Sequence, residues 1–154
     1  DLSNVWDFDG TDIMLEVDPE NEGAFEEATA NLVTNHDFAA DSNWTKGTGW
    51  TISGGTASCD GSQSSNADLT SQNLTTQKDV QYEITYTVSN YSAGTIKTRL
   101  SSGNVTSEQS SNGTFTEVIT AAATAGFTLR GNSTFVGSVD NVTVKEYAIT
   151  PLNV

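Results

Sequence analysis

The sequence has little of what a small enzyme or a cross-linked domain requires. Its 154 residues include one cysteine, Cys59, and one histidine, His36. A single cysteine excludes an intrachain disulfide, and a catalytic pair would need a nucleophile placed beside His36, for which the sequence offers no candidate. We interpret Cys59 as a small buried hydrophobic residue and His36 as a structural residue near a turn. We therefore expect no catalytic residues and no enzymatic activity.

Basic residues are also scarce. Six Lys and Arg residues stand against twenty Asp and Glu residues, which gives a net charge of -14 and a pI of about 4.1. Nucleic-acid binding needs clustered basic side chains that displace counterions from phosphates, and an acidic surface repels anionic lipids for the same reason. No apolar run approaches the ~20 residues needed to span a bilayer. We expect neither nucleic acid nor membrane as a partner.

The acidic residues are unevenly distributed along the chain. Residues 1–30 contain ten acids and no Lys or Arg, whereas residues 31–154 contain the other ten acids and all six bases. This arm therefore carries -10 and the remainder only -4. We predict three parts: an acidic N-terminal arm at 1–30, a folded body at 31–147 and a C-terminal tail at 148–154.

The arm is apolar as well as acidic. Residues 5–8 and 13–17 are candidate short strands on either side of a turn at Asp9-Gly10, and residues 24–30 are expected to form one or two helical turns. The arm is too short to bury its own apolar side chains, so we expect it to dock on a neighbouring subunit or domain. The expected docking residues are Trp6, Phe8, Ile13, Met14, Leu15 and Val17.

The body is typical of an all-β sandwich, because short β-branched stretches alternate with Gly, Asn and Ser. Residues 50–53 and 56–59 flank Gly54-Gly55 and predict a hairpin. Residues 80–88 alternate cleanly, which places Tyr82 and Tyr86 on the inner face of a strand. After a turn at 90–94, further strands are expected at 95–100, 114–120, 126–130 and 137–146, with a bulge near 115–119.

Three segments resemble a known family. Residues 31–38, Asn-Leu-Val-Thr-Asn-His-Asp-Phe, look like the opening strand of carbohydrate-binding-module-like jelly rolls, although His36 replaces the usual glycine. Residues 44–57 resemble their second block and residues 135–146 their last strand. In its richness in Ser, Thr and Asn, the chain resembles the modules found in bacteriophage virion proteins. Related modules also occur in bacterial glycoside hydrolases.

The resemblance implies an antiparallel jelly-roll β-sandwich and two kinds of candidate site. Jelly rolls of this kind often hold a structural calcium between the first and last strands, where the matching residues are Asp37 and Asp140. The alternative is that Asp37 makes a turn bond and Asp140 caps a strand end. Glycan binding would need exposed aromatic rings, and Trp44 and Tyr91, which lie at turns, are the best candidates. Trp50 is expected to face the core.

The leading functional hypothesis is a non-enzymatic bacteriophage virion structural protein. We expect a capsid decoration or head-fibre component on the particle surface, docked by its arm on the major capsid protein or on sister subunits, with a trimer as the expected oligomer and no required cofactor. Two alternatives remain open. One is an extracellular carbohydrate-binding module of a bacterial glycoside hydrolase, and the other is a receptor-binding module of a phage tail fibre that contacts a cell-surface glycan.

Overall fold

The computed structural model describes residues 24–28, 30–101 and 103–151 of the chain. Within these residues it contains strands and no helix, so no helix of the described part could cross a lipid bilayer. The strands are β1 (Ala24–Ala28), β2 (Trp44–Lys46), β3 (Trp50–Ser53), β4 (Thr56–Asp60), β5 (Ala67–Thr76), β6 (Gln81–Ala93), β7 (Ile96–Ser101), β8 (Asn104–Val105), β9 (Gly113–Thr120), β10 (Ala125–Gly131) and β11 (Val136–Pro151).

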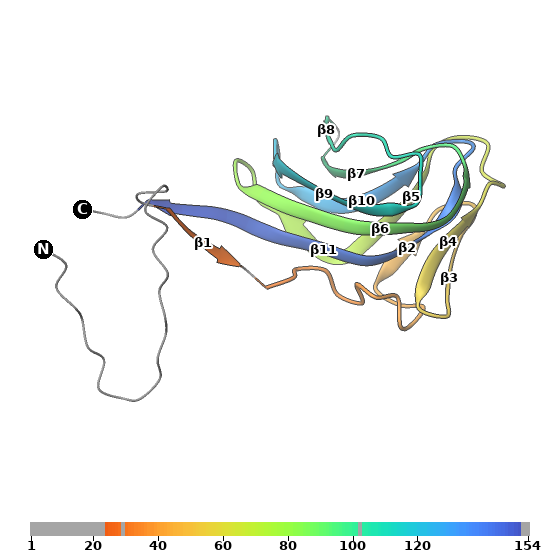
Figure 1. Ribbon diagram of the computed structural model, residues 1–154, viewed down its shortest axis with the longest axis horizontal. Coiled ribbons are helices and arrows are strands. Elements are labelled where there is room, and N and C mark those ends of the chain that lie inside the picture. Colours follow the sequence, from red (N-terminus) through yellow and green to blue (C-terminus); the bar gives the residue numbers. More distant parts are fainter. Residues whose placement is uncertain (1–23, 29, 102, 152–154) are drawn as a thin grey trace, which may run out of the picture.

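The strands form two antiparallel sheets that pack face to face as a β-sandwich (Figure 1). Sheet I has the order β3-β4-β11-β6-β9, with β1 attached to the far end of β11, and sheet II has the order β2-β5-β10-β7-β8. From β4 to β11 the chain crosses repeatedly between the two sheets. The resulting strand orders are β4-β11-β6-β9 in sheet I and β5-β10-β7-β8 in sheet II. These orders are the double Greek key of a jelly roll. The expected fold class is confirmed.

The core lies between the two sheets and is built by alternation along each strand. The period of two that the sequence shows along β6 is confirmed, because Tyr82, Ile84, Tyr86 and Val88 are each at most 2% exposed. Trp50 faces inward as expected, with its ring centroid 5.9 Å from that of Phe135. Burial of these large side chains supplies the main driving force for closing the sandwich.

The hairpin between β3 and β4 is also confirmed. Gly54 and Gly55 have φ angles of 61° and 78°, and Ser53 pairs directly with Thr56. Two consecutive positive φ angles match the type I′ turn, whose twist suits antiparallel strands and which favours glycine at both central positions.

Two local expectations are wrong. The predicted turn at 90–94 is shorter, since β6 continues to Ala93 with Asn90 at φ 51°, and only then does Gly94 turn the chain at φ 74°. The bulge expected near 115–119 is absent, because β9 pairs with β6 without a register shift. The irregularities of sheet I lie instead between β11 and β6, after Val136 and after Asp140.

The expected opening strand at 31–38 is not a strand. Residues 34–37 form a turn, and Asn35 and Phe38 have positive φ angles of 53° and 50°. The segment nevertheless follows β11, because Leu32 N donates to Val144 O and Val142 N donates to the carbonyl of His36, each at 2.9 Å. The side chain of Asn31 adds bonds to the backbone of Val142 and Val144. These contacts replace a regular ladder.

The helical turns expected at 24–30 are also wrong. Residues 24–28 form β1, which pairs antiparallel with the end of β11, from Ala24 opposite Pro151 to Ala28 opposite Tyr147. The last strand therefore extends past residue 147, where the body was expected to end. A cross-strand partner overrides the weak local preference for helix.

Candidate functional site

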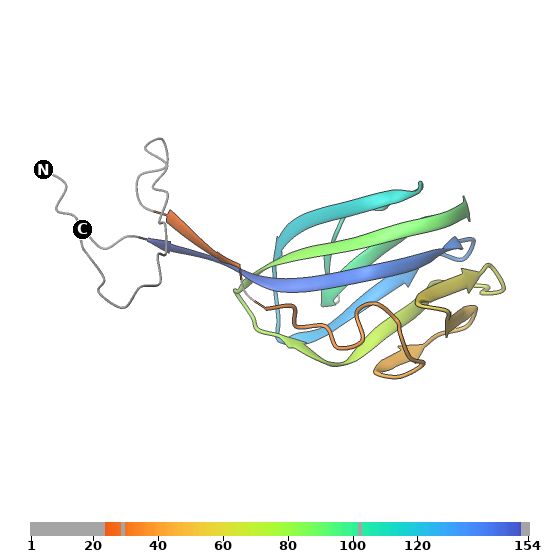
Figure 2. The same cartoon turned by 60° about the horizontal axis from the view of Figure 1, so that its bottom comes forward.

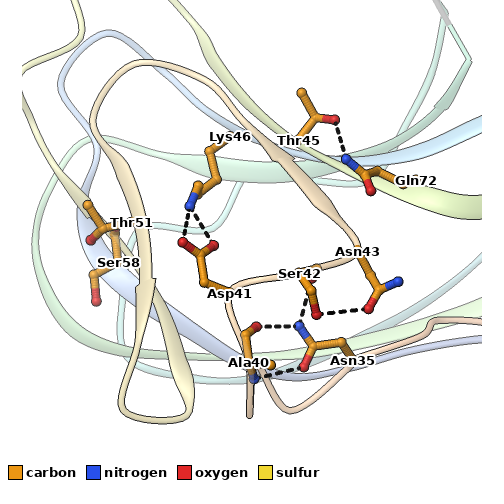
Figure 3. A network of polar contacts seen from close by, with 10 residues as sticks. All are labelled: Asn35, Ala40, Asp41, Ser42, Asn43, Thr45, Lys46, Thr51, Ser58 and Gln72. Carbon is orange, nitrogen blue, oxygen red and sulfur yellow. Dashed lines mark hydrogen bonds and ion pairs between the residues drawn. The ribbon is translucent and has the colours of Figure 1, made fainter.

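The loop that precedes β2 is closed by one asparagine side chain (Figure 3). Asn35 Nδ2 donates to the carbonyls of Ala40 and Ser42 at 2.7 and 2.8 Å, and its Oδ1 accepts from Ala40 N at 3.2 Å. Asparagine tolerates the positive φ found here and bonds readily to nearby backbone. The network therefore fixes the loop.

Trp44 follows this loop and is not an exposed platform for a sugar. Its ring is only 4% exposed, and its centroid lies 5.2 Å from that of Phe38 and 6.3 Å from that of Phe127. Its Nε1 donates to the carbonyl of Asn35 at 3.1 Å. The expectation of an exposed Trp44 is wrong, because β2 turns this residue inward and Phe38 packs against it.

Tyr91 retains partial exposure. It packs against the core, and its hydroxyl donates to Gly94 O at 3.0 Å while its backbone N donates to Asn112 Oδ1 at 2.9 Å. The ring is held in one orientation at the end of β6. A fixed aromatic ring that is partly exposed could stack on a sugar, so the prediction for Tyr91 stands as a prediction.

The two aspartates expected to hold calcium bond to groups close to them in the sequence. Asp37 Oδ1 accepts from Ala39 N at 3.3 Å, and the carboxylate of Asp140 accepts from the backbone N and side-chain amide of Asn141 at 2.6 and 3.1 Å. Within the described ranges, no group of three or more His, Cys, Asp and Glu residues could hold a metal ion. Asp37 thus makes the turn bond of the alternative interpretation, whereas Asp140 lies within β11, where the pairing with β6 shifts register, and does not cap a strand end. The calcium site remains a prediction.

Cys59 occupies a structural position. It is 2% exposed, and its thiol donates to Gln63 Oε1 at 3.3 Å. Burial raises the pKa of this thiol, and the neighbouring charge of Asp60 adds to the shift. A protonated, buried thiol is a poor nucleophile.

The outer face of sheet II carries a charged cluster that the sequence did not indicate. Arg130 Nε and Nη2 donate to the two oxygens of Asp68 at 2.6 and 2.7 Å, and Arg99 Nη1 lies 3.6 Å from the same carboxylate. The bond to Asp68 raises the pKa of Arg130. Beside them, Lys97 donates to Glu108 at 2.7 Å and this bond lowers the pKa of Glu108. No sequence signal could have found Asp68 and Arg130, because they meet only through the pairing of β5 with β10.

The ribbon formed by β1 and the end of β11 projects from one end of the sandwich (Figures 1 and 2). The pairing of β6 with β11 ends at Tyr82 and Glu146, whereas β1 pairs with β11 from Tyr147 to Pro151. Beyond the sandwich, the described chain is therefore only two strands wide. The expected docking residues Trp6, Phe8, Ile13, Met14, Leu15 and Val17 lie outside the described residues.

Comparison with known proteins does not place the chain in a family. No family model matches it, and no curated protein matches it.

Proposed function

We propose that this protein is a non-enzymatic structural component of a bacteriophage virion, namely a capsid decoration or head-fibre protein. The jelly roll would be displayed on the particle surface and the two chain ends would attach it there. The observation that carries this proposal is the terminal ribbon, because β1 and the end of β11 leave the sandwich together on one side.

A two-stranded ribbon has a physical reason to seek a partner. An isolated pair of strands is marginally stable in water and becomes independently stable when further strands or a hydrophobic face join it. By sequence β1 belongs to the arm, which carries ten acids in all and, ahead of β1, the apolar residues named above. Burial of such apolar side chains against a capsid protein or a sister subunit would stabilise both the ribbon and the attachment.

The side chains of the body support an architectural role more than a chemical one. Cys59 is buried and Trp44 belongs to the core. The carbohydrate-binding alternative retains Tyr91 as its aromatic contact, and a tail-fibre receptor module would use the same residue. Neither of these two alternatives assigns a function to the terminal ribbon.

The test compares the full chain with a variant in which the six apolar docking residues of the arm are replaced by serine. This variant keeps every arm acid, so it separates apolar docking from charge. We expect the wild-type protein to bind purified virions from the source of the sequence, and an antibody against the jelly roll to label their surface. We expect the variant to lose this binding while its circular dichroism stays unchanged.

Two results would overturn the proposal. One is unchanged particle binding by the serine variant. The other is the absence of the protein from virions together with specific retention on an oligosaccharide column, which would favour the carbohydrate-binding alternative. A matched control with serine at Thr51 and Thr120, two exposed body positions, should bind virions like the wild type.

A further inference from the structure

One edge of the sandwich is longer than the others. Sheet I ends in β3, with four residues, and in β9, with eight, while sheet II ends in β2, with three, and in β8, with two. Natural proteins keep exposed edge strands short, because unpaired N–H and C=O groups can pair with another chain. Within the described part of the chain no strand pairs with the outer side of β9, the outermost strand, in cyan, of sheet I in Figure 2.

The β9 edge also lacks the usual protection against pairing. It contains no proline or lysine, and it pairs with β6 residue by residue, from Gly113 opposite Val88 to Thr120 opposite Gln81, without a bulge. Its sequence, Gly-Thr-Phe-Thr-Glu-Val-Ile-Thr, is rich in residues that favour strands. An edge of this kind is a regular template for one more strand.

The one charge on β9, Glu117, lies in the less exposed of the two rows of the strand and bonds to the segment after β8. The carboxylate of Glu117 accepts hydrogen bonds from Ser107 N at 3.0 and 3.1 Å, and Ser107 Oγ donates to it at 3.4 Å. Ser107 follows β8, so this contact joins the margins of the two sheets. Glu117 is therefore engaged within its own chain.

The outward-facing row of β9 is neutral. Thr114 and Thr116 bond to hydroxyls of β6 at 2.9 and 2.8 Å, which shows that threonine pairs already join neighbouring strands of this face. Val118, at 43%, is the most exposed large hydrophobic residue of the described chain. On β6, Glu83 lies between Val118 of β9 and Lys145 of β11, so the negative charge of Glu83 has a basic neighbour.

From this we infer that β9 pairs antiparallel with β9 of a second copy of the chain, which makes sheet I continuous across a two-fold axis. An antiparallel strand pair is self-complementary, as a two-fold dimer requires. We assign the axis to Val118, because that register places Val118 opposite itself and Thr116 opposite Thr120 of the second copy. A register centred one residue earlier would place the two Glu117 side chains directly opposite each other, which is unfavourable.

Electrostatic repulsion between two copies of the body is weaker than the net charge of -14 for the whole chain suggests. Half of the acids lie in residues 1–30, and the body carries only -4. The inference goes beyond the proposed function, since it concerns a contact between copies rather than attachment to a particle. It gives a dimer and not the trimer expected from the sequence.

The first test is Val118→Lys, with Thr51→Lys on the opposite edge strand as the matched control. The new lysine lies opposite Glu83 in its own sheet, so the variant should fold, but in the dimer two lysines would face each other. By light scattering across micromolar to millimolar concentrations, wild type and control should approach twice the 16.3 kDa chain mass. Val118→Lys should raise the dimer dissociation constant at least about tenfold. A wild-type protein that stays monomeric, or a Val118→Lys dimer of unchanged affinity, overturns the inference.

A second test determines the register in which the two β9 strands pair. Directly opposite residues have Cβ atoms about 4.5–5.5 Å apart, close to what a disulfide needs. Val118→Cys should therefore form a covalent dimer on mild oxidation, whereas Thr120→Cys should not, because residue 120 faces residue 116. Equal cross-linking of both variants would contradict the register. The serine variant of the arm should dimerise like the wild type, so this test and the virion test can fail independently.

Discussion

Replacing Trp44 with alanine separates the two interpretations of this residue. As a core residue it is 4% exposed, contacts the rings of Phe38 and Phe127, and donates from Nε1 to Asn35 O at 3.1 Å. Truncation of a buried Trp leaves a large cavity and typically costs about 3–5 kcal/mol. The loss of the indole bond should also loosen the loop that Asn35 closes. We therefore expect Trp44→Ala to lower the free energy of unfolding by about 3–5 kcal/mol.

Urea denaturation followed by far-UV circular dichroism measures this loss, with an unchanged slope if the unfolding reaction stays two-state. At about 2–4 °C per kcal/mol for a domain of this size, Tm should fall by about 6–20 °C. Trp44→Phe keeps most of the ring and removes the N–H, so it should lose about 1–2 kcal/mol. If Trp44→Ala changed stability by less than about 1 kcal/mol but abolished retention on an oligosaccharide, the ring would work at the surface and our reasoning would be wrong.

Three further predictions concern other parts of the body. Asp68→Asn weakens the paired bonds to Arg130, and because both side chains are partly exposed we expect a loss of about 1 kcal/mol that shrinks at high salt, as measured by urea denaturation. Burial raises the pKa of Cys59, so the folded thiol should resist iodoacetamide at mildly alkaline pH. Its stabilising contribution should decline as pH rises above the ordinary thiol pKa, because the unfolded thiol ionises first; fast alkylation without urea would contradict this. Gly94→Ala should cost about 2 kcal/mol or more by thermal melting, since a Cβ there would lie 2.5 Å from Phe135 Cα at a φ of 74°. Gly54→Ala, in open space, should cost about 1 kcal/mol.

The parts of the fold that local chemistry determines could be predicted from the sequence. Along β6, apolar residues alternate with polar ones over many positions, which determines the face of the strand that packs in the core. The pair Gly54-Gly55 likewise determines the turn type of the hairpin between β3 and β4. Both features need only neighbouring residues. The jelly roll itself was expected from these strands together with the resemblance at residues 31–38, 44–57 and 135–146, of which 31–38 form no strand.

The parts that depend on distant partners could not be predicted. In β5 the buried side chains are Ala67, Leu69, Ser71, Leu74 and Thr76, and the alternation shifts between Ser71 and Leu74. A polar, interrupted pattern of this kind carries no strand signal, and its pairing with β10 also shifts register between Gly126 and Thr128. The burial of Trp44 could not be predicted either, because its strand β2 has only three residues and is too short to show an alternating pattern. Its inward orientation is evident only from its contacts with Phe38 and Phe127.

The distribution of bonded groups indicates what kind of partner the body suits. Several polar side chains of the body already bond within the chain, either to one another, as in the Asp68–Arg130 pair and the threonine pairs between β6 and β9, or to backbone groups, as in the Asn35 loop. Their capacity for a new contact is low. Among the backbone edges of the described structure, the outer side of β9 has no described strand beside it, and the ribbon of β1 and β11 is only two strands wide. Backbone N–H and C=O groups at a strand edge bind another strand far better than a small molecule, because only a strand matches their spacing. On the two proposals above, the ribbon would hold a partner while the β9 edge would hold a second copy of the chain.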